Sequence, residues 1–186
     1  MKKLVITACA RNESNTMRIF KTIQVLKNWD EQDIEILDLY KLVPKYLTEE
    51  TLINNVPYQE EIVNHFAKFE EIIIVYPTWN WGIPAILKAY FDLIMIANTT
   101  FKIDGVKLIG LTKLKKCTII NTSGFKILPK PIAYLFNINH DRFYVKNMVK
   151  ILGAKQINII ALGNFGNKKY SNEEIVKFAK THLHKI

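Results

Sequence analysis

The sequence has little cysteine, no long apolar run and few acidic residues. Cys9 and Cys117 are the only cysteines among 186 residues, which excludes a disulfide scaffold, offers no metal-ligand spacing and favours a reducing compartment. No apolar run approaches the roughly 20 residues of a membrane-spanning helix. The apolar segment Leu4–Ile6 is also too short for the core of a signal peptide. We therefore expect a cytoplasmic protein with no membrane partner and no metal.

The chain has 17 acidic residues and 26 lysines and arginines, which gives a net charge of +9. A nucleic-acid-binding protein gathers such charge to neutralise phosphates, but here the lysines are spread along the chain. We interpret the densest cluster, Lys113–Lys116, as a solvated turn. We expect no nucleic-acid partner, although a basic surface can still steer a small polyanion such as a pyridine nucleotide.

Alternating strand-like and helix-like segments define the expected fold. Hydrophobic residues make up 49% of the chain and charged residues 23%, and the length predicts a single domain over residues 1–186. The expected strands are Lys3–Ala8, Ile34–Leu39, Ile72–Tyr76, Cys117–Asn121 and Gln156–Ala161. The sequence therefore predicts an α/β protein, a doubly wound five-stranded parallel sheet of order 2-1-3-4-5 with helices on both faces.

The connections are expected to be helices, one hairpin and two long loops. The expected helices are Met17–Lys27, Tyr58–Phe69, Ala85–Ile96, Phe143–Leu152 and one that the capping box Ser171–Glu174 opens. Asp104-Gly105 between alternating residues predicts a tight hairpin. Tyr40–Pro57 and Lys126–Asp141 have no clear period and are expected to be loops, the first with a short helical turn near Glu49 and the second with room for a short helix.

The stretch Pro77–Asp92, PTWNWGIPAILKAYFD, follows the third strand and is the one around which the chain is organised. Gly82 gives its loop backbone freedom, and a helix begins near Pro84. The loop carries Trp79 and Trp81 to the carboxyl edge of a strand, where open α/β sheets bind ligands. Packing in the core or in an interface also explains two tryptophans, so the residues by themselves leave both interpretations open.

Small polar loops follow the first and fourth strands. In Cys9–Thr16, helix-terminal amides, the helix dipole and the hydroxyls of Ser14 and Thr16 can bind one phosphate. The alternative is that Ser14 or Asn15 acts only as an N-cap. The other polar loop is Thr122–Phe125. With the tryptophan loop these segments leave neighbouring strands and fit a flavin: the first cradles its phosphate, the second lies along the isoalloxazine ring, and the third flanks the ring.

At these residues the sequence resembles the flavodoxin-like NAD(P)H quinone reductase and FMN-dependent azoreductase family. Arg11 and Ser14-Asn15-Thr16 match its phosphate loop, while Cys9 and Ala10 stand where Ser and Pro are common. Thr122-Ser123-Gly124 is similar to its loop beside the flavin. The most specific match comprises Pro77, Asn80, Pro84, Leu87-Lys88, Tyr90-Phe91-Asp92 and Thr100-Phe101, with Trp79 and Trp81 replacing other large residues. The resemblance fades after Gly124.

The resemblance implies a flavodoxin-like fold and transfer of a hydride from NADH or NADPH through FMN to a quinone, azo or nitro compound. FMN is preferred to FAD because the chain is short and shows no second aromatic platform for an adenine. No side chain is assigned a catalytic role, and neither Tyr134 nor His140 aligns with the tyrosine and histidine of the quinone reductases. The implied cofactor-binding residues are Cys9, Arg11, Ser14, Asn15, Thr16, Pro77, Thr78, Trp79, Asn80, Trp81, Thr122, Ser123 and Gly124.

The backbone amides of Trp79, Asn80 and Trp81 are expected to hydrogen-bond the N1, O2 and N5 edge of the ring. Because family members are homodimers, the resemblance also implies a homodimer, with the apolar helix Ala85–Ile96 as a contact. Two alternatives remain: a flavodoxin-type electron carrier without a substrate, and a flavin-free regulatory or nucleic-acid-binding protein on the same fold.

Overall fold

The centre of the molecule is a five-stranded parallel sheet with the order β2-β1-β3-β6-β7. The computed structural model describes residues 2–49, 57–124, 140–163 and 170–186. The strands are β1 (Lys3–Thr7), β2 (Ile34–Asp38), β3 (Glu71–Pro77), β6 (Lys116–Thr122) and β7 (Gln156–Leu162). This confirms the predicted fold class and strand order.

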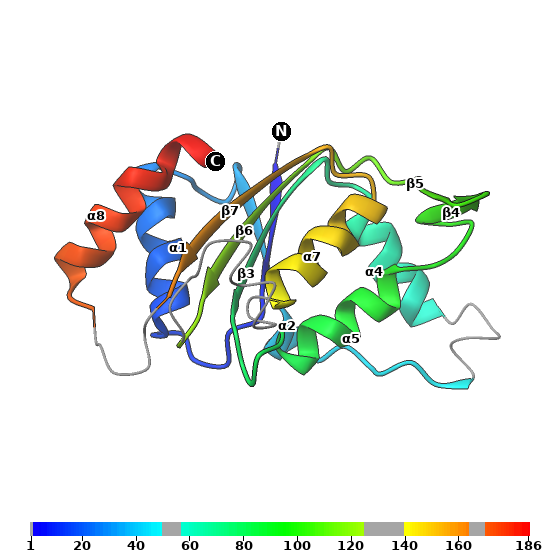
Figure 1. The fold of residues 1–186 in the computed structure, drawn as a ribbon, viewed down its shortest axis with the longest axis horizontal. Coiled ribbons are helices and arrows are strands. Elements are labelled where there is room, and N and C mark those ends of the chain that lie inside the picture. Colours follow the sequence, from blue (N-terminus) through cyan, green and yellow to red (C-terminus); the bar gives the residue numbers. More distant parts are fainter. Residues whose placement is uncertain (1, 50–56, 125–139, 164–169) are drawn as a thin grey trace.

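Helices cover both faces of the sheet (Figure 1). One face carries α1 (Asn15–Leu26) and α8 (Asn172–His182), the latter ending in the short 3-10 helix Leu183–Lys185. The other face carries α2 (Leu39–Leu42), α4 (Pro57–Phe66), α5 (Ala85–Ile94) and α7 (His140–Ile151). None of the helices in the described ranges has the length and apolar character needed to cross a bilayer.

Strand β3 shows why the sheet is buried on both sides. Ile72, Ile74 and Tyr76 pack into the core beneath α4, α5 and α7. Ile73 and Val75 pack into the opposite core beneath α1 and α8. Side chains alternate between the faces of a strand, so a parallel strand covered on both faces needs a continuous apolar run. Full burial of each such side chain contributes roughly 1.5–3 kcal/mol to folding.

Several predicted boundaries of helices and loops need correction. The expected loop after β2 begins as helix α2, which Asp38 caps by accepting a hydrogen bond from the Tyr40 amide at 3.0 Å. Helix α4 ends at Phe66 rather than Phe69, and α7 already begins at His140 within the expected loop. The turn expected near Glu49 adjoins residues 50–56, and most of the loop expected at 126–141 falls in residues 125–139; both segments lie outside the described ranges.

Helix α5 does not need a second subunit to cover its apolar face. It carries apolar side chains on more than one side and packs against α2 and α4 of the same chain. The residues of α5 that are buried in the single chain are Leu87, Ala89, Tyr90, Phe91, Leu93 and Ile94. The single chain therefore accounts for the breadth of the apolar stripe, and a subunit contact through this helix stays a prediction.

A two-stranded hairpin projects from the sheet on the side of α4 and α7 (Figure 1). Its strands β4 (Phe101–Asp104) and β5 (Lys107–Gly110) are antiparallel, with Asp104 paired to Lys107 across the turn. Gly105 takes a φ of 59°, which glycine adopts without the steric cost of a side chain. The hairpin predicted from Asp104-Gly105 is confirmed.

Candidate functional site

A cavity of about 160 Å³ lies at the carboxyl ends of β1, β3 and β6. Three loops form its walls, one after each strand, as expected at the point where the strand order reverses. It is lined by every predicted site residue except Asn80 and Trp81, and by Ala10 in addition. The lining residues are Cys9, Ala10, Arg11, Ser14, Asn15, Thr16, Pro77, Thr78, Trp79, Thr122, Ser123 and Gly124.

Strand pairing continues into these loops and fixes them relative to one another. The Ala8 amide donates to the Val75 carbonyl at 2.9 Å, and the Thr78 amide donates to the Thr122 carbonyl at 2.7 Å. The Ser123 amide donates to the carbonyl of Leu162 on β7 at 3.0 Å. These bonds extend the sheet ladder, so the sheet fixes the backbone where each loop begins.

Hydroxyl groups and the first turn of α1 form one end of the cavity. The Ser14 hydroxyl accepts a hydrogen bond from the Met17 amide at 3.3 Å, so Ser14 is an N-cap, as the alternative interpretation held. The other first-turn amides of a helix have no intrahelical acceptor and lie at the positive end of its dipole. The Thr16 and Thr122 hydroxyls lie 2.5 Å apart and are buried. This end of the cavity is suited to an anion.

Arg18 is a residue beside the cavity that the sequence did not single out. Its guanidinium donates to the Asn15 side-chain oxygen at 2.8 Å, to the Tyr170 carbonyl at 3.0 Å and to the Asn172 side chain at 2.7 Å. It therefore fixes Asn15 and ties the start of α1 to the start of α8. The predicted Arg11, by contrast, is exposed at the cavity rim.

Cys9 forms an apolar part of the wall. Its thiol is buried and points to the Val75 carbonyl at 3.6 Å. Burial raises the pKa of Cys9 to about 12, and hydrogen bonds with Ser14 and Thr16 oppose this shift only partly. The thiol is therefore protonated at neutral pH and acts as a small packing group rather than a nucleophile.

The tryptophan loop is a tight turn. The Trp79 amide donates to the Gly82 carbonyl at 3.0 Å, and the Gly82 amide donates back to the Trp79 carbonyl at 2.8 Å. The two central residues, Asn80 and Trp81, have φ angles of 47° and 69°, the backbone of a two-residue hairpin turn. Trp79 and Trp81 are 46% and 50% exposed, so the interpretation as buried core residues is wrong. The Trp79 amide is used within the turn and does not serve the predicted ring contact.

Asp141 and Asn121 are two further residues that sequence reasoning missed. Asp141 lies in the first turn of α7, where the sequence predicted a loop, and Asn121 ends a predicted strand. Both side chains contact Thr78, a residue of the cavity wall. An acidic residue just ahead of a helical pattern is a usual first-turn signal, but nothing local connects it to a loop 63 positions away.

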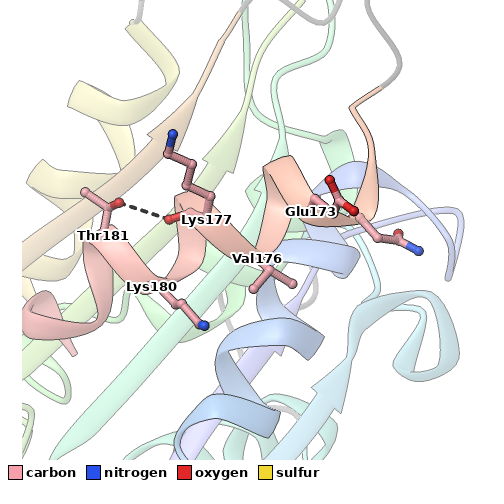
Figure 2. Close-up of a pocket in the computed structure, with 6 residues that line it drawn as sticks. Glu173, Val176, Lys177, Lys180 and Thr181 are labelled. Atoms are coloured by element: carbon pink, nitrogen blue, oxygen red, sulfur yellow. Dashed lines mark hydrogen bonds between the residues drawn. The ribbon is translucent and has the colours of Figure 1, made fainter.

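A second hollow, of about 550 Å³, runs along α8 (Figure 2). Its lining residues are Asn172, Glu173, Val176, Lys177, Lys180 and Thr181. All come from one helix, and Thr181 donates its hydroxyl only to the Lys177 carbonyl of the same helix at 2.9 Å. Among the residues that the structure describes, no second element brings polar groups to a common point here, so we assign this hollow no binding role.

The doubly wound sheet, with its cavity at the switch between β1 and β3, defines an α/β protein of the flavodoxin type. The family model described as flavodoxin-like fold matches residues 1–186 of the chain. The protein belongs to this family, and the family resemblance that the sequence indicated is confirmed.

Curated relatives match most of the chain. An FMN-dependent NADH:quinone oxidoreductase of Coprothermobacter proteolyticus is 34% identical over 174 residues, covering 86% of this chain and 85% of the relative. A protein of the same name from Clostridium perfringens is 32% identical over 189 residues, covering 95% of this chain and 92% of the relative.

Solved structures show the same fold. An FMN-dependent NADH-azoreductase of Bacillus anthracis, solved in complex with FMN, has a TM-score of 0.81 at 22% identity and covers 99% of this chain and 96% of its own. An azoreductase from the Sterne strain of that species has a TM-score of 0.80 at 21% identity, and the match covers 100% of this chain and 97% of the azoreductase.

Proposed function

We propose that this protein is an FMN-dependent oxidoreductase that takes a hydride from NADH or NADPH and reduces a quinone, azo or nitro compound. The observation that carries the proposal is the cavity that three loops form at the switch point of the sheet. The names of relatives more than 30% identical over most of the chain support the same activity. FMN is the proposed cofactor, with FAD less favoured.

The anion end of the cavity fits the phosphate of FMN. The N-terminus of α1 supplies amides and a positive dipole end, and the Thr16 and Thr122 hydroxyls supply further hydrogen bonds. Arg11 and Arg18 add positive charge beside the same turn. No carboxylate lines the cavity as the structure describes it, so nothing there opposes a phosphate.

The ring of FMN would lie outside this narrow end. The cavity of about 160 Å³ is smaller than the roughly 300–1,000 Å³ of a site that encloses a whole ligand. The Trp79 indole stands half exposed at its rim and could stack on a flat ring, a contact of about 1 kcal/mol beyond burial. Bound FMN supplies the hydride chemistry itself, and the side chains are assigned only binding and orientation.

An electron carrier is the alternative function, and a basic net charge of +9 together with the projecting hairpin argues against it. The deciding experiment is to purify the protein, record its visible spectrum and follow NADH and NADPH oxidation with a quinone present. We expect a yellow protein that NADH or NADPH bleaches and a quinone recolours. A yellow protein inert to both nucleotides would indicate a carrier, and a colourless one that cannot be reconstituted with FMN would refute both.

We also propose a homodimer, which would form through the hairpin. Ile103 and Leu108 pair on one face of the hairpin and are 68% and 49% exposed, and Val106 at the turn is fully exposed. Apolar side chains that gather on an extension of the fold favour association. Sedimentation should show a dimer at micromolar concentration, and Ile103→Glu should shift it to a monomer. A monomeric wild-type protein would contradict this proposal.

The turn at Asn80 supports a prediction that separates catalysis from cofactor retention. Asn80→Ala places a residue without a local hydrogen-bonding side chain at φ 47°, at a cost of about 1 kcal/mol. Because the phosphate end is untouched, FMN affinity should stay within about twofold while turnover falls several-fold. Asn80→Gly is the control, since glycine adopts this φ freely and should retain more turnover. Equal turnover in wild type and Asn80→Ala would contradict a role for the turn.

We propose the cytoplasm as the site of action. Both cysteines are free thiols and buried, as a reducing compartment allows. A nucleic-acid partner is not proposed, because the cavity is lined by loops suited to one phosphorylated small molecule.

A further inference from the structure

A buried polar cluster lies behind the second loop of the site. The Thr78 hydroxyl donates to the Asp141 carboxylate at 2.7 Å. The Asn121 side-chain amide donates to the same carboxylate oxygen at 3.2 Å and to the Thr78 hydroxyl at 3.1 Å. It also lies 3.2 Å from the Tyr76 carbonyl. The loop after β3, strand β6 and helix α7 therefore meet at one carboxylate.

The Asp141 carboxylate is buried, since the residue is only 2% exposed to solvent. A charge in such a place is retained only where hydrogen bonds and nearby positive charge compensate for lost hydration. Thr78 and Asn121 donate to it, it sits in the first turn of α7 at the positive end of the helix dipole, and Arg142 follows it in the chain. Two hydrogen bonds to one carboxylate oxygen and the nearby positive charge therefore favour the charged form.

The charge of Asp141 is felt by its buried neighbours. Burial raises the pKa of Tyr76 well above its ordinary value, and the nearby Asp141 charge raises it further. Burial lowers the pKa of Arg142, and Asp141 opposes that shift. The charge of this carboxylate thus acts on Tyr76 and Arg142 as well as on Thr78 and Asn121, as expected where water does not screen it.

Thr78 connects this cluster to the cavity. Its side chain faces Asp141, while the residue itself lines the cavity between Pro77 and Trp79. Its backbone amide is held by the Thr122 carbonyl at 2.7 Å. With both its hydroxyl and its amide engaged, Thr78 has little freedom, and the loop that would face the flavin ring is fixed from behind.

We propose that Asp141 is a positioning residue of the flavin site: through Thr78 it holds the second loop in place, and its buried negative charge keeps the reduction potential of bound FMN low. The inference rests on the proposed function. Reduction adds negative charge to the ring, and a fixed negative charge nearby in a poorly screened environment disfavours it. A purely structural carboxylate would fix the loop without influencing the potential.

The test is the midpoint potential of the FMN-loaded protein, measured by equilibrium titration against a redox dye. Asp141→Asn keeps the size of the side chain and an oxygen that can accept from Thr78, but removes the charge. We expect the potential to rise by about 30 mV, which corresponds to a tenfold gain in the affinity for reduced relative to oxidised FMN. An unchanged potential with FMN bound would overturn the inference.

Glu71→Gln is the matched control, because it also removes a partly buried carboxylate from the sheet. Glu71 pairs with Lys3 at 3.2 Å and with Lys116 at 3.1 Å at the opposite end of β3. Six strand residues at about 3.3 Å each place it roughly 20 Å from Pro77, beyond the Debye length of about 8 Å at physiological salt. The midpoint potential of FMN in Glu71→Gln should match that in the wild type. A shift equal to that of Asp141→Asn would overturn the inference.

Thr78→Val provides a second variant in case Asp141→Asn does not fold. It removes a hydroxyl that donates to the buried carboxylate, and a buried negative charge with one donor fewer is less favoured. The potential should then rise, in the same direction as for Asp141→Asn, and a fall or no change would overturn the inference. A wild-type protein that binds no FMN would refute the proposed function itself. If NADH reduces the FMN of the wild type but the variants leave its midpoint potential unchanged, only the role of Asp141 is refuted.

Discussion

Replacing Thr16 by valine is expected to weaken FMN binding by about 10- to 100-fold while the fold is retained. The Thr16 hydroxyl lies at the anion end of the cavity, 2.5 Å from the Thr122 hydroxyl, and the residue is 1% exposed. A hydrogen bond to a charged group contributes about 1.5–3 kcal/mol, and each 1.4 kcal/mol is tenfold in affinity. Titration of apoprotein with FMN, followed by the quenching of flavin fluorescence, measures the change.

Thr118→Val is the matched control for Thr16→Val. Thr118 is fully buried in β6, the strand that ends at Thr122, but it lies in the middle of the sheet. In the part of the chain that the structure describes, its hydroxyl has no hydrogen-bond partner, so valine removes an unsatisfied polar group. FMN affinity should be unchanged and stability unchanged or slightly higher. If both variants lose affinity equally, the hydroxyl pair is not the phosphate cradle.

Replacing Gly110 by alanine is expected to destabilise the fold by about 3 kcal/mol. A Cβ at Gly110 would lie 2.5 Å from the Gly153 Cα and backbone N, and 2.6 Å from the Leu152 carbonyl carbon. These are backbone atoms at the end of α7, which cannot rotate away as a side chain would, so the hairpin and the helix must separate. For a chain of this size the melting temperature should fall by roughly 6–12 °C. Urea denaturation followed by circular dichroism measures the free energy of unfolding.

Gly82→Ala controls for the general effect of adding a methyl group at a glycine. The nearest atom to a Cβ there is the Trp79 carbonyl oxygen at 3.8 Å, which is an ordinary van der Waals contact, and its φ is not positive. We expect a change within about 0.5 kcal/mol, as for most surface substitutions. A Gly110→Ala protein as stable as Gly82→Ala would show that the contact between β5 and α7 adjusts freely.

Much of the fold could be predicted from the sequence because its signals are local. The run Ile72–Val75 is apolar at every position, and only a strand covered on both faces needs such a run. The capping box predicted at Ser171–Glu174 is present, with the Ser171 hydroxyl and the Glu174 carboxylate each accepting a backbone amide. Boundaries were less certain elsewhere, since α7 begins at His140, ahead of the predicted start at Phe143.

The sequence alone determined the order of elements and the chemistry of the three loops, because strand periodicity, N-cap residues and polar turns are properties of neighbouring residues. Only the tertiary structure decided that Trp79 pairs back onto Gly82, that α5 is covered within its own chain and that Asp141 stands behind Thr78. Thr78 and Asp141 are 63 positions apart. A buried hydrogen bond over that distance depends on how β3, β6 and α7 pack, and no local pattern of residues encodes it.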